Sequence, residues 1–353
     1  MRVFVIVALL VLSVASHVGG EEPLFRLKLA DQWLEGTPLA FSDTRVVLLA
    51  RDGQRHDIQP AAVQDFSKLS GGFRSLGGAD LRGQLLREFG QGYDVSGAGN
   101  FLVVHPAGQR DRWAPRFEEL YRSFMHYFTA RGWRPEAPQF PLVAVVFARQ
   151  VDFAQQAQRE GVAASGMLGY YSPQTNRILL YDSSAQQGGD WTLNGETIIH
   201  EAAHQAAFNT GIHSRFGQSP RWVVEGLGTM FEARGVWNSR QHPQLADRVN
   251  RGRLTQYRQL AARRRPGALA ELVSSDRPFQ ADTDRAYAEA WALTFFLCET
   301  EPKKYFQYLA KTAAIENFVA YPGPQRLADF TAVFGSDLKL LDARLQRFLN
   351  GIK

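Results

Sequence analysis

Apolar and polar residues alternate near the N-terminus with the period of a β-strand. Residues 25–29 alternate in this way, and residues 44–49 form a run of apolar and β-branched side chains. The Asp-Gly pair at residues 52–53 follows that run and favours a hairpin turn. We therefore predict a small β-rich module in residues 21–70, and the Ser-Gly-Gly and Leu-Gly-Gly sequences within residues 66–78 predict a linker.

The middle of the chain mixes strand and helix patterns. The apolar, β-branched run at residues 142–147 predicts a strand that is buried on both faces. Apolar residues at every third or fourth position of residues 113–131 predict an amphipathic helix. In chain order, the predicted elements are a helix at 81–89, a hairpin of 93–95 and 101–105, the helix at 113–131, the strand at 142–147, a helix at 151–159, and a hairpin within 168–181 whose second strand is 177–181.

The last part of the chain is predicted to be helical. Residues 285–299 form a strongly apolar helix, and a proline opens the next helix at residues 302–313. Ser336 is predicted to cap a final amphipathic helix that ends near Gly351. The predicted fold class is α+β, with a mixed sheet and its helices followed by a helical C-terminal half in residues 80–353, and with the small β module before them.

A positive charge and a short apolar run identify the N-terminus as a targeting segment. Arg2 precedes an apolar run at residues 3–14, which is too short to span a bilayer comfortably, and residues 13–15 offer a small-x-small cleavage pattern. We predict that residues 1–20 are a signal peptide and that the mature protein is exported, periplasmic or extracellular, without a stable membrane span. An uncleaved segment would instead tether the protein to the membrane.

Composition narrows the classes of partner. The 353 residues are 45% apolar, which is enough for one large or two smaller domains. The net charge is +5, but Lys and Arg are scattered, and we interpret the densest cluster, at residues 263–265, as a solvated loop. We therefore expect no nucleic-acid partner. The single cysteine, Cys298, excludes an intrachain disulfide and is interpreted as a packing residue. The sequence indicates no particular oligomeric state.

Residues 200–204 read His-Glu-Ala-Ala-His, the H-E-x-x-H pattern of zinc peptidases. On a helix, His200 and His204 lie one above the other on one face, where two imidazoles can hold one tetrahedral metal ion. Neighbouring alanines favour the helix, and Asn194 is its predicted N-cap. The alternative interpretation is a pair of surface histidines that flank a helix-forming Glu201.

A catalytic zinc ion needs a third protein ligand and an open fourth position. Glu225 lies in the apolar segment at residues 222–226, which has helical character and follows Pro220. A carboxylate on a second helix that crosses the first is a suitable third ligand. Because two imidazoles and a carboxylate suit zinc, we predict that His200, His204 and Glu225 bind Zn²⁺.

The sequence HEAAH followed by WVVEGLGTMFE resembles the gluzincin-type zinc metallopeptidases, whose third ligand is a Glu in a similar context. The longer set GYYSPQTNRILLYD, TIIHEAAHQAAFNTG and WVVEGL is similar to a secreted peptidase-MA-like domain of unknown function, family 1570. The resemblance covers about residues 101–297. It implies a zincin-like fold, His200, His204 and Glu225 as zinc ligands, and Glu201 as the general base.

The resemblance also implies features around the ligands. In that architecture an edge strand near the metal helix pairs with an extended substrate, and the hairpin around residues 177–181 would supply it. Gluzincins often bring a Tyr from a later helix to steady the oxyanion, which makes Tyr287 a candidate for this role; the alternative is a core aromatic, and His213 is a weaker candidate. Some gluzincins place an acidic residue four positions after the ligand Glu, where this chain has Thr229, and Glu232 is the alternative.

We therefore predict an exported zinc metallopeptidase that acts on a peptide or protein substrate, with Glu201 and Tyr287 as catalytic residues. Two alternatives stay open. The protein is a catalytically idle, metal-containing module that holds a peptide or polymer at its edge strand, or it is a zinc hydrolase that acts on a non-peptide amide. Glu201 favours an enzyme, since a binding module has no need of a general base.

Overall fold

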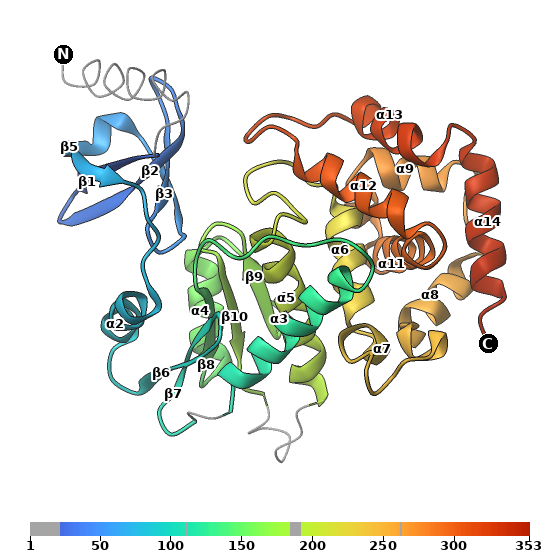
Figure 1. The fold of residues 1–353 in the computed structure, drawn as a ribbon, viewed down its shortest axis with the longest axis horizontal. Helices are drawn as coiled ribbons and strands as arrows, with labels where there is room; N and C mark the ends of the chain where they lie inside the picture. Colours follow the sequence, from blue (N-terminus) through green and yellow to red (C-terminus); the bar gives the residue numbers. More distant parts are fainter. Residues whose placement is uncertain (1–21, 110–111, 184–191, 262) are drawn as a thin grey trace.

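The computed structural model describes residues 22–109, 112–183, 192–261 and 263–353, which form two sheets followed by a helical C-terminal half (Figure 1). The predicted α+β fold class, with its N-terminal β module, is confirmed. The predicted signal peptide, residues 1–20, lies outside the described residues. No helix of the described ranges combines the length and the apolar character that a membrane span requires.

The N-terminal module is a fully antiparallel sheet with the strand order β4-β3-β2-β1-β5. Alternate residues of β1 and β3, among them Phe25, Leu27 and Val46, point inward and form its small core. The linker prediction is wrong for residues 66–72, because these residues pair with β1 and extend the last strand. The strands are β1 (Pro23–Leu29), β2 (Gln32–Phe41), β3 (Val46–Ala50), β4 (Arg55–Ile58) and β5 (Val63–Gly72), with a short 3-10 helix, η1 (Pro60–Ala62), before β5.

The second sheet has the strand order β6-β7-β8-β10-β9, with β7, β8 and β10 parallel and the two outer strands antiparallel. The predicted strand at Leu142–Phe147 is confirmed as β8, in the middle of the sheet. The predicted hairpin is also confirmed, but its first strand, β9, is the edge strand, and β10 lies inside the sheet. The strands are β6 (Tyr93–Ala98), β7 (Phe101–Pro106), β8 (Leu142–Phe147), β9 (Gly169–Ser172) and β10 (Arg177–Tyr181).

Helices cover both faces of this sheet. Alternate residues of β8 belong to different cores: Val143 and Val145 pack with α2 (Gly78–Phe89) and α4 (Gln150–Arg159), and Ala144 packs with α3 (Ala114–Thr129) and α5 (Thr192–Asn209). Burial on both faces explains why the strand is apolar throughout. Helix α5 begins at Thr192, so Asn194 lies inside the helix and the predicted N-cap is wrong.

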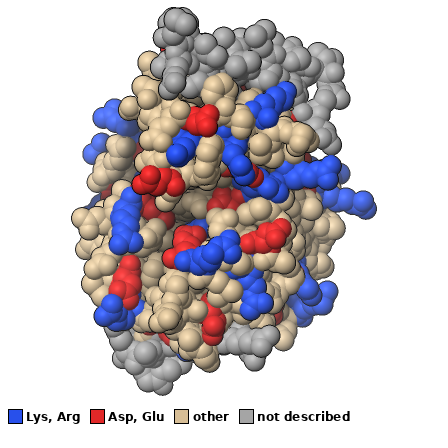
Figure 2. Space-filling model, turned by 90° about the vertical axis from the view of Figure 1, so that its left-hand side faces the viewer, with Lys and Arg blue, Asp and Glu red and all other residues tan. Residues whose placement is uncertain are grey.

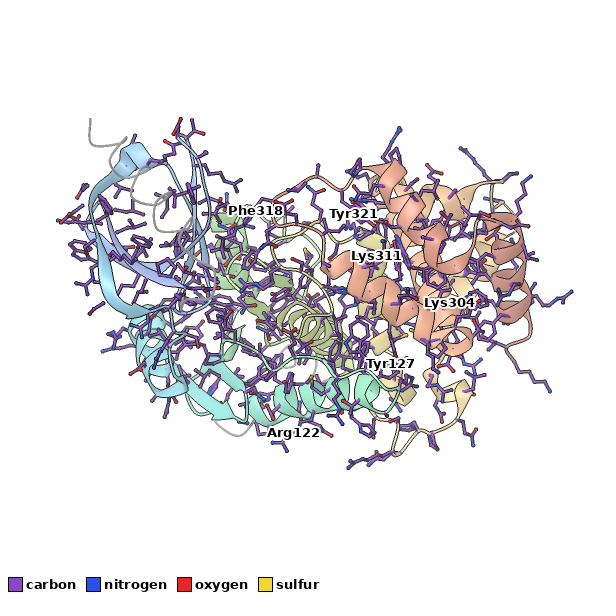
Figure 3. All side chains as sticks on the ribbon, turned by 45° about the horizontal axis from the view of Figure 1, so that its top comes forward. Arg122, Tyr127, Lys304, Lys311, Phe318 and Tyr321 are labelled. Atoms are coloured by element: carbon purple, nitrogen blue, oxygen red, sulfur yellow. The ribbon has the colours of Figure 1, made fainter. Side chains whose placement is uncertain are left out.

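The C-terminal half is built around α11 (Thr283–Thr300), which is buried on all sides over residues 288–298 and packs against α6 (Arg221–Phe231). A helix that is apolar all round must be enclosed by others. At the junction of the two halves, Tyr127 at the end of α3 packs its ring against Phe231 at 5.2 Å (Figure 3). The remaining helices are α7 (Arg234–Trp237), the 3-10 helix η3 (Leu245–Arg248), α8 (Arg251–Ala261), α9 (Ala268–Ser274), α10 (Pro278–Ala281), α12 (Pro302–Ala313), α13 (Gly323–Phe334) and α14 (Leu338–Asn350).

Two local predictions in this half are corrected. The final helix is capped by Asp337, whose carboxylate accepts a hydrogen bond from Leu340 N at 2.9 Å, and not by Ser336. The arginine cluster is not simply a solvated loop, because the Arg264 side chain is buried and forms ion pairs with Glu289 (3.3 Å) and Asp342. Its partners lie far along the chain, so the local sequence gave no sign of them.

The N-terminal module is attached to the second sheet at the turn between β9 and β10. Arg55 N donates to Gln174 O at 2.8 Å, and the turn before β4 places Gly53 against the ring of Phe140. On the side of the molecule that carries the module, Lys and Arg side chains are interspersed with Asp and Glu (Figure 2). The module therefore contacts the β9–β10 hairpin, whose first strand, β9, is the edge of the second sheet.

Candidate metal centre

Helices α5 and α6 bring the three predicted ligands together. The imidazole centroids of His200 and His204 are 4.4 Å apart, and their Nε2 atoms lie 3.5 Å and 3.4 Å from Glu225 Oε2. All three ligand atoms lie within 4.8 Å of one another. Ligands held about 2.0–2.2 Å from one tetrahedral ion are separated by roughly 3.3–3.6 Å. The donor set and its spacing therefore fit a single divalent metal ion.

The charges and burial of the three predicted ligands favour a bound cation. Glu225 Oε2 is buried and has no hydrogen-bond partner among the described residues, an arrangement that is costly without a cation. Burial opposes charging of His200, but the Glu225 and Glu232 carboxylates outweigh it and raise the His200 pKa well above its usual range. Burial alone would raise the pKa of Glu225, but the two imidazoles hold it well below its usual value. A metal ion held by the three side chains would supply that positive charge.

An outer carboxylate fixes one of the two imidazoles. Glu232 Oε1 lies 2.8 Å from His200 Nδ1, and its Oε2 accepts a hydrogen bond from Asn250 Nδ2 at 2.7 Å. Such a contact orients the ring and leaves Nε2 for the metal. Thr229 instead donates to the Glu225 carbonyl oxygen of its own helix at 2.7 Å. Of the two positions considered from sequence, Glu232 is therefore the one that contacts a histidine.

A glycine on α6 allows the imidazoles to approach this helix. A Cβ at Gly228 would lie 2.8 Å from His204 Cε1 and 2.9 Å from His200 Cε1, which is closer than real Cβ contacts. Gly228 was not a predicted site residue. The available signal was a second glycine, two residues after Gly226, in the middle of an apolar helix, where glycine is unfavourable.

Glu201 is held by the edge strand. Its Oε2 accepts a hydrogen bond from the Tyr171 backbone N–H of β9 at 2.7 Å. Burial raises the pKa of the Glu201 carboxyl, and the His200 and His204 imidazoles and the Tyr171 N–H oppose this shift without cancelling it. A carboxylate with a raised pKa is a better proton acceptor at neutral pH than an ordinary one. Tyr171 was not a predicted site residue, although the hairpin that carries it was predicted.

Tyr287 lies at the margin of the metal centre. It comes from α11, its ring packs edge-on against Phe279 at 5.6 Å, and the Arg253 guanidinium lies 5.1 Å from the ring centroid. Burial raises the pKa of the Tyr287 hydroxyl, and the Glu225 carboxylate, with which it interacts, raises it further. The structure thus brings Tyr287 to the third ligand, and its catalytic role stays a prediction.

His213 lies beside the centre but inside the protein. Its side chain is only 1% exposed, and its ring packs edge-on against Phe208 at 5.2 Å. Neither ring nitrogen has a hydrogen-bond partner within the described part of the chain. Burial, together with the nearby His204 imidazole, lowers the His213 pKa to about 3, so the ring is neutral. This burial makes His213 less suited than Tyr287 to contact a substrate.

Comparison with known proteins finds a family match over part of the chain. Residues 194–318 match a family described as "Protein of unknown function (DUF1570)". No curated protein matches the chain. The matched segment includes His200, Glu201, His204, Glu225 and Tyr287, and it excludes the N-terminal module and all strands of the second sheet.

Proposed function

We propose that this protein is an exported zinc-dependent metallopeptidase. One observation carries the proposal: two imidazoles and a carboxylate converge within 4.8 Å, beside a second carboxylate that a sheet edge holds in place. A metal site that only stabilised the fold would be closed by four protein ligands, whereas three protein ligands leave a position for chemistry. Glu201 then lies where a general base is needed, beside this open position.

His200, His204 and Glu225 would hold the metal ion, and a ligand set of two imidazoles and a carboxylate suits zinc. When bound, zinc would supply Lewis-acid chemistry that polarises a carbonyl and lowers the pKa of a water molecule. Glu201 accepts the proton of the attacking water and passes it to the leaving amine. The Tyr171 N–H keeps the Glu201 carboxylate aimed at the reacting atoms, and the Tyr287 hydroxyl donates to the developing oxyanion.

The edge strand gives the proposed substrate a place to bind. Strand β9 has a strand neighbour on one side only, so an extended peptide can pair with the backbone groups of its outer side that Glu201 does not already bind. Tyr171 belongs to this strand and contacts Glu201, so a peptide on β9 passes directly beside the general base. Backbone pairing of this kind favours peptides over other amides, which is why we propose a peptide or protein as the substrate.

The test compares zinc content and peptide cleavage in wild type and Glu201→Gln. Elemental analysis should find equal zinc in both, and cleavage of a broad peptide library should fall by about 10²–10⁴-fold in the variant. A chelator should abolish cleavage by the wild type. Glu196→Gln, an exposed carboxylate on the same helix, is the matched control and should behave as wild type. A zinc-loaded wild type that cleaves no peptide would favour the idle binding module.

A further inference from the structure

A cavity of about 350 Å³ lies beside the candidate metal centre. Three residues that line the cavity lie on or next to the elements that carry the metal centre. Pro173 directly follows β9, and Phe208 lies one turn after His204 on α5. Val224 directly precedes Glu225 on α6. Pro173 places the cavity at the end of β9, where the side chains of a peptide paired with that strand would reach it. These three walls are apolar, as suits the methylene part of a side chain.

The other walls carry one positive charge in excess. Arg326 donates to Asp276 Oδ1 at 2.9 Å, so these two charges compensate each other. Arg215 has no carboxylate oxygen within 4.0 Å among the described residues. Its Nη2 instead donates to the carbonyl oxygens of Pro173 and Gly53, both at 2.8 Å. Carbonyl groups orient a guanidinium, but they do not neutralise its charge.

The surroundings of Arg215 make an anion favourable there. Burial lowers the Arg215 pKa and Arg55 lowers it further, while the Tyr171 hydroxyl and the Asp52 carboxylate raise it. A partly desolvated cation gains more from a carboxylate than a solvated one does. Ser219 also lines this cavity, and its buried hydroxyl oxygen lacks a hydrogen-bond partner in the described ranges, so a bound carboxylate would give the hydroxyl an acceptor.

The loop that carries Arg215 is held by the segment that precedes α13. Phe318 N donates to the Phe216 carbonyl oxygen at 2.8 Å, and Tyr321 N donates to Gln218 Oε1 at 3.1 Å. Phe318 also reaches the N-terminal module, where the Arg45 guanidinium lies 5.7 Å from its ring centroid (Figure 3). The cavity is thus preorganised, which reduces the entropy lost on binding.

We propose that this cavity is a specificity pocket that binds a carboxylate of the peptide substrate, with Arg215 supplying the charge and Ser219 a hydrogen bond. The proposal rests on the peptidase function above, because it assigns the cavity to the same substrate. The carboxylate comes either from an Asp or Glu side chain next to the scissile bond or from a free C-terminus. Both sources present the same two oxygens, and the experiment separates them.

The test measures binding by fluorescence anisotropy, with zinc-loaded, full-length Glu201→Gln protein that cannot consume the ligand. The probes are labelled peptide pools with a fixed central Glu or a fixed central Gln, each made with a free and with an amidated C-terminus. A charge-assisted hydrogen bond predicts roughly 10–100-fold tighter binding of the carboxylate-bearing pool. A preference that follows the central residue identifies a side chain, and one that follows the free terminus identifies the α-carboxylate.

Three variants test whether the preference for carboxylate-bearing peptides arises in this cavity. Added to the Glu201→Gln background, Arg215→Met should abolish it and Arg215→Lys should keep part of it. Ser219→Ala should reduce it by a few fold at unchanged stability, because the hydroxyl has no partner to lose. Arg149→Met is the matched control: this side chain is 71% exposed, lies at the N-cap of α4, and should leave the preference intact.

Equal binding of all four pools, or a preference that survives both Arg215→Met and Ser219→Ala, would overturn the pocket. Neither result bears on the peptidase, which stands if the wild type cleaves the pools. Conversely, a clear carboxylate preference in binding, with no cleavage by the wild type, would support the pocket and reject the peptidase.

Discussion

The two faces of α6 carry glycines two residues apart, and each glycine makes a different close approach possible. A Cβ at Gly226 would lie 2.2 Å from Thr294 Oγ1 and 2.7 Å from the Ala290 carbonyl oxygen, both on α11. A Cβ at Gly228 would meet the rings of His200 and His204 instead. One face therefore packs against the core and the other against the candidate metal ligands.

The packing on the two faces of α6 explains how the third ligand, Glu225, is placed. Close packing on α11 fixes α6 from behind, so that the Glu225 carboxylate projects to a defined point in front of α5. On the front face, a small residue leaves the imidazoles room to reach the same point. The precision of the centre depends on packing behind the helix as much as on the ligands, as expected for a site built on rigid elements.

The variant with the largest expected effect, Tyr287→Phe, tests whether α11 only packs against α6 or also contributes a catalytic side chain. Tyr287 lies on α11 and interacts with Glu225. Removal of one oxyanion donor typically lowers kcat by about 10²–10³-fold, so Tyr287→Phe should have an effect of this size at unchanged zinc content. Steady-state kinetics with a cleaved peptide, together with elemental analysis, checks it. Wild-type kinetics would make Tyr287 a core aromatic, as the alternative interpretation holds.

The two glycines provide the next test as a matched pair. Gly226→Ala should lower the free energy of unfolding by about 1–3 kcal/mol, because the added methyl group overpacks a backbone contact. Gly228→Ala should mainly weaken zinc binding, since the methyl group displaces both imidazoles. Urea unfolding of the metal-free proteins and zinc titration separate the two effects. If both variants lose the same stability and keep wild-type zinc affinity, the two faces do not differ as described.

The smallest expected effect concerns the carboxylate behind His200. Glu232→Gln keeps the size of the side chain but removes the charge that orients the ring, and outer contacts of this kind change metal affinity by about 10–100-fold. Zinc competition with a chromophoric chelator measures the change. Asn250→Ala, which removes a donor to Glu232, should weaken binding in the same direction but by less. An unchanged zinc affinity in Glu232→Gln would show that this contact does not support the site.

Much of the fold could be predicted because local patterns were unambiguous. The apolar run of β8 and the Pro-led helix Pro302–Ala313 have the predicted bounds. Errors arose where local signals competed: Ser336 and Asp337 are both good caps, and glycines at the end of β5 resembled a linker although β1 pairs with them. Propensity alone does not decide between such neighbours.

The residues of the candidate site were likewise predictable only in part. His200, His204 and Glu225 were predictable because the spacing of two ligands on one helix is a property of the helix. The contacts of Glu201 with Tyr171, and of the imidazoles with Gly228, were not, because they join segments that only the tertiary structure brings together. The pairing of Glu232 with His200 could be named only as one of two possibilities.

Zinc affinity of the wild type and Glu225→Ala, measured by competition with a chromophoric chelator, tests the central claim most directly. The account predicts one zinc ion per wild-type chain and a large loss of affinity in Glu225→Ala, with Glu196→Ala unchanged. Failure of the wild type to bind zinc stoichiometrically, or equal affinity in Glu225→Ala, would contradict the convergence of α5 and α6 on one metal ion.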